Sequence, residues 1–172
     1  MKYLTIWCIV TLSLFSLEIG EVPPLVSLQG EAGGTVLGKA WSSRTLEGKV
    51  HLLLYMDPDK ADETEVLFKR LSQTSQSLKG YSSVAIINLE ATWLPNKLIE
   101  AKLRKKQKSL KNMVYLFDKH RLLVKRWGLK DNDANVIILD PKMRVVYVHH
   151  GTLSPLEVEK IFQKLEATVK KG

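Results

Sequence analysis

Four carboxylates that could do chemistry come directly after the apolar run 49–56. They are Asp57, Asp59, Asp62 and Glu63. Closely spaced carboxylates can bind calcium or act as general acid and base. A calcium loop is a poor fit, because Ala61 and Asp62 stand where it needs an oxygen ligand and a glycine. We interpret the acids as residues that favour a helix N-terminus, where each contributes about 0.3–1 kcal/mol.

The histidines do not suggest a metal site. His149 and His150 are adjacent at the end of a predicted strand, so their side chains point to opposite faces. We interpret them as a strand edge that runs into a turn at Gly151. The sequence also has no Gly-rich phosphate loop, His-Glu-x-x-His motif or nucleophile elbow. We therefore expect no bound metal, no cofactor and no catalytic residue of these types.

The single cysteine, Cys8, lies in an apolar N-terminal leader. Lys2 precedes about 15 mostly apolar residues, a length typical of a secretory signal peptide. We predict cleavage after Ser16, which leaves one domain, residues 17–172, in the periplasm or another extracytoplasmic compartment. The alternative is an uncleaved N-terminal anchor. After cleavage no disulfide or cysteine-based metal site could form.

Hydrophobic patterning predicts alternating strands and helices after a turn-rich segment at 21–38. The predicted strands are 49–56, 81–89 and 113–117, followed by a hairpin of 135–140 and 144–149. The predicted helices are about 61–78, 95–110, 121–127 and 155–169, the last one beginning with a Ser154–Glu157 capping box. Strands that alternate with helices require crossover connections and a parallel core. The closing hairpin makes the sheet mixed, with helices on both faces.

Several segments of the chain resemble thioredoxin-like proteins of the TlpA and peroxiredoxin type. Residues 19–28 are similar to their N-terminal segment, and Leu46-Glu47-Gly48-Lys49-Val50 is similar to the lead into their first core strand. The closer resemblance is to the YtfJ family of exported bacterial proteins. It rests on Trp41, the same Leu46–Val50 segment, Ile86-Ile87-Asn88, 134–140, Arg144-Val145 and 151–158. The resemblance implies an α/β, thioredoxin-like fold of three layers.

The same resemblance locates the place where redox-active members carry their chemistry. Those proteins have a Cys-x-x-Cys after the first core strand and a cis-proline before the hairpin. Here 57–63 and Asp133-Ala134-Asn135 occupy these positions. We therefore expect neither thiol oxidoreductase nor peroxidase activity. The predicted ligand or partner surface at this end consists of Trp41, Asp57, Asp59, Asp62, Asp133 and Asn135.

Positive charge is concentrated in one segment. Residues 97–130 contain 12 Lys and Arg but 2 Asp and Glu, whereas the whole chain carries a net charge of +8. The predicted basic surface consists of Lys102, Arg104, Lys105, Lys106 and Lys108. Such a surface could bind anionic lipid head groups or an acidic protein, or it could be a solvated helix face. Nucleic acid suits the charge, but an exported chain rarely meets it.

These observations favour a non-redox binding or accessory protein of the cell envelope. Its partner would be a protein or an anionic envelope component, and peripheral membrane association fits the charge. One alternative is an envelope-associated protein held at anionic surfaces by residues 97–130. Another is an enzyme that uses non-thiol chemistry near Asp57.

Overall fold

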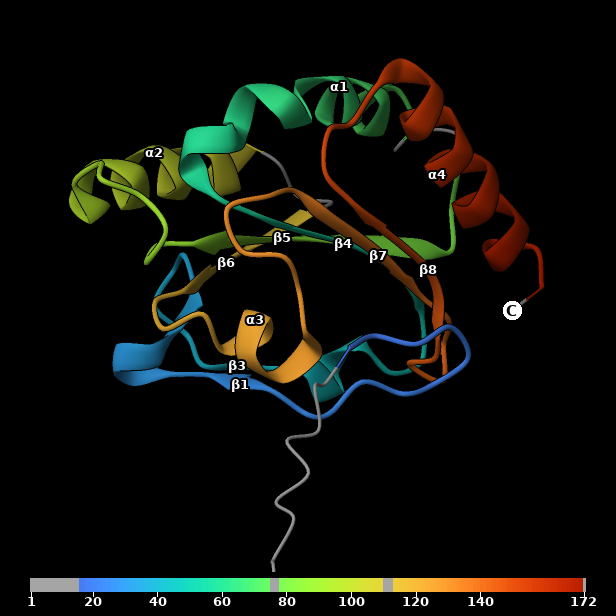
Figure 1. Ribbon diagram of the computed structural model, residues 1–172, viewed down its shortest axis with the longest axis horizontal. Coiled ribbons are helices and arrows are strands. Elements are labelled where there is room, and N and C mark those ends of the chain that lie inside the picture. The colour runs from blue at the N-terminus through green and yellow to red at the C-terminus, as the bar shows by residue number, and fades with distance from the viewer. Residues whose placement is uncertain (1–15, 75–77, 110–112, 172) are drawn as a thin grey trace, which may run out of the picture.

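A six-stranded mixed sheet forms the centre of the protein. The computed structural model describes residues 16–74, 78–109 and 113–171. The strand order is β2-β6-β5-β4-β7-β8, and helices cover both faces of the sheet (Figure 1). A second, two-stranded sheet pairs β1 (Ser27–Leu28) with β3 (Trp41–Ser42). The order of the main strands and helices is the predicted one.

Three parallel strands occupy the middle of the main sheet. They are β4 (Val50–Met56), β5 (Tyr81–Asn88) and β6 (Met113–Asp118). All seven residues of β4 are buried, as expected for a parallel strand covered on both faces. Parallel pairing brings the C-terminal ends of the three strands to one edge. There Met56 pairs with Ile87, and Asn88 pairs with Asp118.

The predicted hairpin is confirmed as β7 (Asn135–Leu139) and β8 (Val145–His150). Its turn is closed by Asp140, whose Oδ1 accepts hydrogen bonds from the N–H groups of Lys142 and Arg144, both at 2.8 Å. β7 runs antiparallel to β4. The turn therefore lies at the opposite end of β4 from the edge where the parallel strands end.

The N-terminal segment contributes an edge strand that the sequence does not indicate. β2 (Gly33–Thr35) pairs antiparallel with β6. A Cβ atom on Gly33 would overlap the carbonyl oxygen of Phe117, and the φ of +125° also favours glycine. Two short 3-10 turns, η1 (Gly30–Ala32) and η2 (Ser43–Leu46), complete the segment.

The helices divide between the two faces of the sheet. Helices α1 (Glu65–Thr74), α2 (Asn96–Ser109) and α4 (Pro155–Val169) lie on one face, and α3 (Leu122–Trp127) lies on the other with β1 and β3 (Figure 1). Each face has its own hydrophobic core. Leu67, Ile161 and Phe162 belong to the first core, whereas Leu123 and Trp127 belong to the second.

The helix predicted at 61–78 begins earlier and has two parts. Residues Pro58–Thr64 form a 3-10 helix, η3, with a kink at Lys60, and α1 begins at Glu65. Proline is favoured at the first helical position because its φ is already helical. The helical backbone therefore starts one residue after Asp57. Residues 75–77, inside the prediction, lie outside the described residues, as does Leu110 at the end of the predicted second helix.

The predicted start of the last helix is confirmed, together with the Ser154 half of its capping box. Ser154 Oγ accepts a hydrogen bond from the N–H of Glu157 at 3.2 Å, and Pro155 opens α4. In the part of the chain that the structure describes, no helix is long and apolar enough to cross a membrane.

Candidate functional site

Asp57 is a buried carboxylic acid at the edge where the parallel strands end. It follows the last residue of β4 and precedes η3, but its side chain makes no capping hydrogen bond to that helix. Only 3% of Asp57 is exposed. Its Oδ1 atom has no hydrogen-bond partner among the described residues. A buried polar atom without a partner is costly, and such atoms are rare in native proteins.

The surroundings of Asp57 raise the pKa of its carboxyl to about 6. Burial is the largest cause, because removal from water disfavours the charged form. The negative charges of Asp131 and Asp59 raise the pKa further. A hydrogen bond from the Asn88 side chain and the positive charge of Arg121 lower it. Asp57 therefore changes its charge close to neutral pH, which an exposed aspartate does not.

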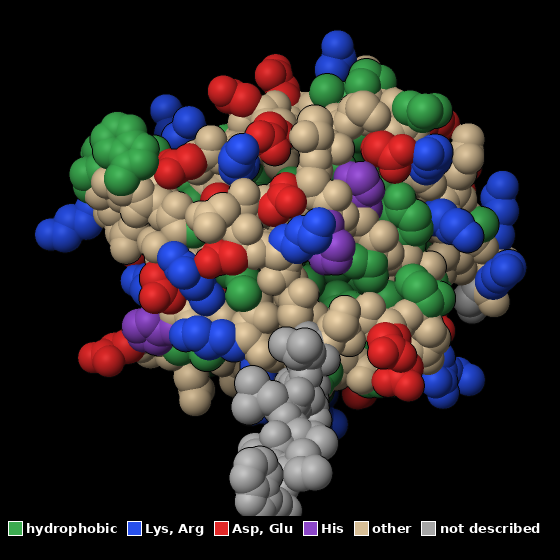
Figure 2. Space-filling view, in the orientation of Figure 1, with side chains coloured by type: hydrophobic (Ala, Val, Ile, Leu, Met, Phe, Trp, Pro, Cys, Tyr) green, Lys and Arg blue, Asp and Glu red, His purple; other side chains and the backbone are tan. Residues whose placement is uncertain are grey.

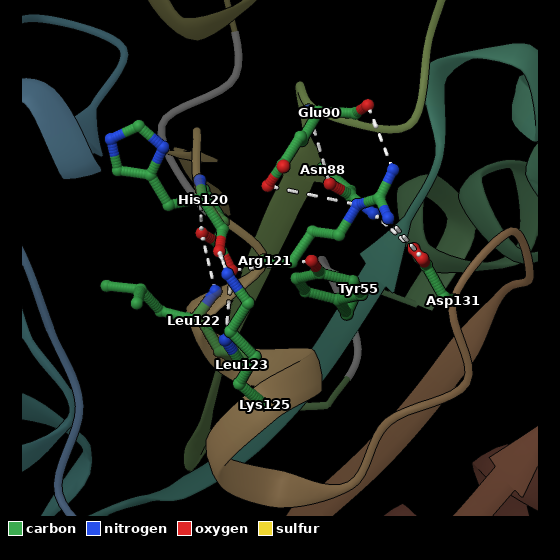
Figure 3. Close-up of polar contacts among 10 residues, drawn as sticks. Tyr55, Asn88, Glu90, His120, Arg121, Leu122, Leu123, Lys125 and Asp131 are labelled. Carbon is green, nitrogen blue, oxygen red and sulfur yellow. Dashed lines mark hydrogen bonds and ion pairs between the residues drawn. The ribbon is translucent and has the colours of Figure 1, made fainter.

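Arg121 connects the end of β5 to the loop before β7. Its Nη1 lies 2.9 Å from Asp131 Oδ2, and its Nη2 donates to the carbonyl oxygen of Glu90 at 3.1 Å (Figure 3). Its backbone is left-handed, with φ of 52°, which is uncommon for a residue other than glycine. Its buried Nε has no hydrogen-bond partner among the described residues, although a Glu90 carboxylate oxygen lies 3.9 Å away.

Asn88 joins these groups into one cluster. It is fully buried, and its Nδ2 donates to Asp131 Oδ1 at 3.0 Å. Its Oδ1 accepts from the N–H of Glu90 at 3.3 Å. We call Asp57, Asn88, Glu90, Arg121 and Asp131 the polar edge cluster. It joins three carboxyl groups, one amide and one guanidinium from four separate segments of the chain.

Asp118, the neighbour of Asn88, has a structural role. Its Oδ1 accepts from the N–H groups of His120 and Leu122 at 3.2 and 2.9 Å. Its Oδ2 accepts from the N–H of Leu123 at 2.9 Å and from the hydroxyl of Tyr55 at 3.3 Å. Burial and then the charge of Asp118 raise the pKa of the Tyr55 phenol, which therefore stays a hydrogen-bond donor. These four bonds hold the start of α3 against the sheet (Figure 3).

Asn135 holds the loop that corresponds to the cis-proline position. Its Oδ1 accepts from the N–H of Lys130 at 2.8 Å, and its Nδ2 donates to the carbonyl oxygen of Lys130 at 2.8 Å. The same Oδ1 lies 2.6 Å from Nδ1 of His150, which must therefore carry a proton. The described residues contain no cis peptide bond. The fully buried amide of Asn135 thus shapes this loop and is not itself part of a surface.

The acids on either side of Asp57 face neighbouring segments. Asp59 is exposed, and its Oδ1 accepts a hydrogen bond from the Thr92 hydroxyl at 2.7 Å. Asp133 lies near η3, because its charge contributes to the raised pKa of Lys60, after the larger effect of Glu63. The predicted residues Asp57, Asp59 and Asp133 are therefore brought to the same end of the sheet.

Two predicted surface residues lie elsewhere. Trp41 is 8% exposed and packs in the second core, with Leu28 and Leu123, so its ring offers no surface to a ligand. Asp62 is exposed but lines a groove between η3 and α2, away from the polar edge cluster. For Trp41 the physical reason is simple, since a short strand beneath α3 needs a large apolar side chain to fill the core.

The structure distributes the predicted basic surface between exposed and half-buried positions on α2. Lys102, Arg104 and Lys105 are exposed, whereas Lys106 is half-buried. The side chain of Lys108 lies outside the described residues. Part of the positive charge is paired within the protein: both Arg104 and Lys119 lie near Glu100, at 3.6 and 2.9 Å.

Four members of the polar edge cluster are not among the site residues predicted from the sequence, namely Asn88, Glu90, Arg121 and Asp131. Arg121 enters the sequence prediction only through the charge of the basic segment. One available signal was that Asp57, Asn88 and Asp118 each stand at the end of a parallel strand, since such ends meet at one edge where ligands commonly bind. Among the described residues, no group of three or more His, Cys, Asp or Glu is placed to hold a metal ion.

Replacing Asp57 with asparagine should stabilise the protein in a pH-dependent way. The folded protein raises the pKa of this carboxyl, so stability is full below the unfolded pKa near 4 and is lost as the pH rises through about 6. At pH 7.5 we expect the free energy of unfolding of Asp57→Asn to exceed that of the unaltered protein by about 1–3 kcal/mol, since one pKa unit corresponds to about 1.4 kcal/mol. Chemical denaturation at pH 4 and pH 7.5 measures the difference, which should vanish at pH 4.

Asp62→Asn, in the same segment but exposed, is the matched control and should give no pH-dependent gain. Destabilisation by Asp57→Asn at both pH values would contradict the assignment. It would mean that the ionised carboxylate stabilises the folded state.

Comparisons with known proteins agree with this fold. A curated relative, the uncharacterized protein YtfJ of Escherichia coli (strain K12), is 22% identical over 168 residues, which are 92% of this chain and 90% of the relative. The exposed lipoprotein thioredoxin of Streptococcus pneumoniae has a TM-score of 0.60 at 17% identity, with 84% of this chain and 99% of that one covered. A thiol peroxidase from Chromobacterium violaceum has a TM-score of 0.65 at 16% identity, with 88% of both chains covered.

The structural relatives show a thioredoxin-like fold, and the chain has no Cys-x-x-Cys motif because Cys8 is its only cysteine. A family model described as a bacterial protein of unknown function, YtfJ_HI0045, matches residues 26–168. The match covers most of the chain and includes the whole polar edge cluster. The protein therefore belongs to the YtfJ_HI0045 family of bacterial proteins.

Proposed function

We propose that this protein is a non-redox binding module of the bacterial cell envelope, and that it holds a polar group of its partner at the polar edge cluster. The observation that carries the proposal is the Asp57 carboxyl, which is buried, lacks a partner on Oδ1 and has a pKa of about 6. Perturbed titratable groups of this kind concentrate at functional sites.

The hydrogen-bonding needs of the cluster suggest what the partner supplies. Asp57 Oδ1 and Arg121 Nε lack hydrogen-bond partners among the described residues. Both atoms are buried, so a partner group that bonded to them would have to enter the cluster. Such a group would need a donor for the carboxylate and an acceptor for the guanidinium. A peptide or side-chain amide carries both. Recovery of two unmade hydrogen bonds would favour binding.

Two further observations support a non-redox role outside the cytoplasm. Asp57 precedes the helix that follows β4, and that helix begins with Pro58-Asp59, so no residue there can act as a thiolate. Export is supported by the sequence of residues 1–16, in which Lys2 precedes an apolar run of signal-peptide length.

The proposal predicts no thiol-disulfide exchange. Protein produced from the whole gene and purified from the cell envelope should not accelerate the reduction of insulin by dithiothreitol above the rate without protein. Catalysed reduction would contradict the non-redox role. Recovery from the cytoplasm with residues 1–16 still attached would contradict export.

Site-specific photocrosslinking in intact cells tests the binding role. A photoreactive amino acid at Asp59, exposed beside the cluster, should give a discrete adduct. The same amino acid at Lys142, exposed in the β7–β8 turn at the other end of β4, should give none. Arg121→Gln should abolish the Asp59 adduct, because it removes the charge that holds Asp131. An equal adduct from both positions, or an adduct unaffected by Arg121→Gln, would refute the assignment.

A second candidate function, attachment to an anionic membrane surface, is favoured by the exposed side chains of α2 and the loop before it. Arg104 and Lys105 are exposed, and Trp93 is 84% exposed. Each cation near an anionic surface contributes about 1 kcal/mol, and tryptophan favours the head-group region.

Vesicles of phosphatidylglycerol test this second function. Binding should weaken as salt rises and should fall about tenfold or more in the double variant Arg104→Glu/Lys105→Glu. Salt-independent binding, or none, would exclude it. Neither residue lies in the polar edge cluster, so the result is independent of the crosslinking test.

A further inference from the structure

A groove of about 390 Å³ lies between η3 and α1 on one side and α2 on the other. Its volume falls within the range of about 300–1,000 Å³ that is usual for small-molecule sites. The walls are largely apolar and include Met56, Phe68, Leu94, Leu98 and Leu103. No residue of the polar edge cluster lines the groove, although Met56 and Pro58, on either side of Asp57 in the chain, do.

Tyr115, on β6, is one of the residues that line this groove. The residue is 1% exposed, and its buried hydroxyl has no hydrogen-bond partner among the described residues. Burial raises the pKa of the phenol to about 12, so the group remains a neutral O–H donor. A ligand acceptor group that entered the groove far enough to reach this donor would satisfy it.

Two lysines of α2 give one wall of the groove a positive charge. Lys102 and Lys106 are four residues apart, so they lie on the same face of the helix. The Nζ of Lys106 is 4.3 Å from the centre of the Phe68 ring and 5.6 Å from that of Tyr115. Burial lowers the pKa of Lys106, and the charge of Lys102 lowers it further. The exposed Lys102 amine gives this wall a positive charge that attracts a negative group.

The charges of the opposite wall and the apolar residues at the rim restrict the kind of ligand that the groove can bind. Asp62 and Glu65 lie on the η3 and α1 side, so an anionic group is favoured only on the α2 side. Leu98, which lines the groove, is 66% exposed, and Trp93 near the start of α2 is 84% exposed. Figure 2 shows a hydrophobic patch with Lys and Arg side chains nearby at the end of the molecule where α2 lies in Figure 1.

We infer that the groove binds a single-chain amphiphile such as a fatty acid, with its chain against the apolar walls and its anionic head group near Lys102, Lys106 and the Tyr115 hydroxyl. The charge on one wall, the apolar volume and the unsatisfied donor each match one part of such a molecule. This inference goes beyond the proposed function and does not depend on it.

Titration calorimetry with laurate, below the concentration at which it forms micelles, tests the inference on the full chain. We expect one laurate per protein and binding at least about tenfold tighter than that of dodecyltrimethylammonium, which has the same chain and a positive head group. Equal affinity for the two amphiphiles, or no binding of laurate, would overturn the inference.

Three variants assign the binding to named groups. Lys102→Glu, at an exposed position, should weaken laurate binding about tenfold or more and strengthen binding of the cationic amphiphile. Tyr115→Phe should weaken laurate binding severalfold without lowering the midpoint of thermal unfolding, because it removes an unsatisfied buried hydroxyl. Lys142→Glu, an equal charge reversal in the β7–β8 turn, should leave the affinity unchanged. Laurate binding that is insensitive to Lys102→Glu and Tyr115→Phe would place the ligand elsewhere.

A vesicle arm separates a free amphiphile from a membrane surface. Vesicles of phosphatidylglycerol should compete with laurate no better than vesicles of phosphatidylcholine. If anionic vesicles bind through Lys102 and Tyr115 while free laurate does not, the ligand of the groove is a lipid in a bilayer and the inference is wrong.

Discussion

Three parallel strands end at the same edge of the sheet, and the polar side chains at their ends come together there in a buried position. Each strand brings a different side chain to this edge, and each is satisfied to a different degree. Asp118 accepts four hydrogen bonds and holds the start of α3. Asn88 is bonded on both ends of its amide. Asp57 keeps one carboxyl oxygen that has no hydrogen-bond partner in the part of the chain that the structure describes. This difference in hydrogen bonding sets Asp57 apart from Asn88 and Asp118, because a buried carboxyl that lacks hydrogen bonds resists ionisation.

The fold could be read from the sequence because its signals are local. An apolar run, a capping box and a hairpin spacing each predict one element, and their order predicts a mixed sheet. The predicted elements differ from the structure where the local sequence signal is weak. β2 is three residues long and depends on the close approach of Gly33 to β6, which no pattern within the strand reveals. The 3-10 start of the first helix depends on Pro58 and the tight exit from β4.

The site was predicted less completely because its members are far apart in the chain. Asp57 and Asp59 stood out as acids after a strand, but Asp131 and Arg121 gain their meaning only from each other. The charge count includes Arg121 only as one of the bases of segment 97–130, whereas in the structure it joins the end of β5 to the loop before β7. Trp41 resembled a site residue, yet it fills the second core. Pairing between distant residues is not encoded in spacing along the sequence.

The protein has a thioredoxin-like fold, and its single cysteine, Cys8, stands in the apolar N-terminal segment, far along the chain from the polar edge cluster. At the polar edge it has a buried carboxyl, that of Asp57, whose pKa is raised to about 6. The most direct test of this account is an NMR titration of the Asp57 carboxyl carbon, assigned by its loss in Asp57→Asn. The account predicts a midpoint near pH 6. A midpoint near pH 4, the value of an exposed aspartate, would contradict it.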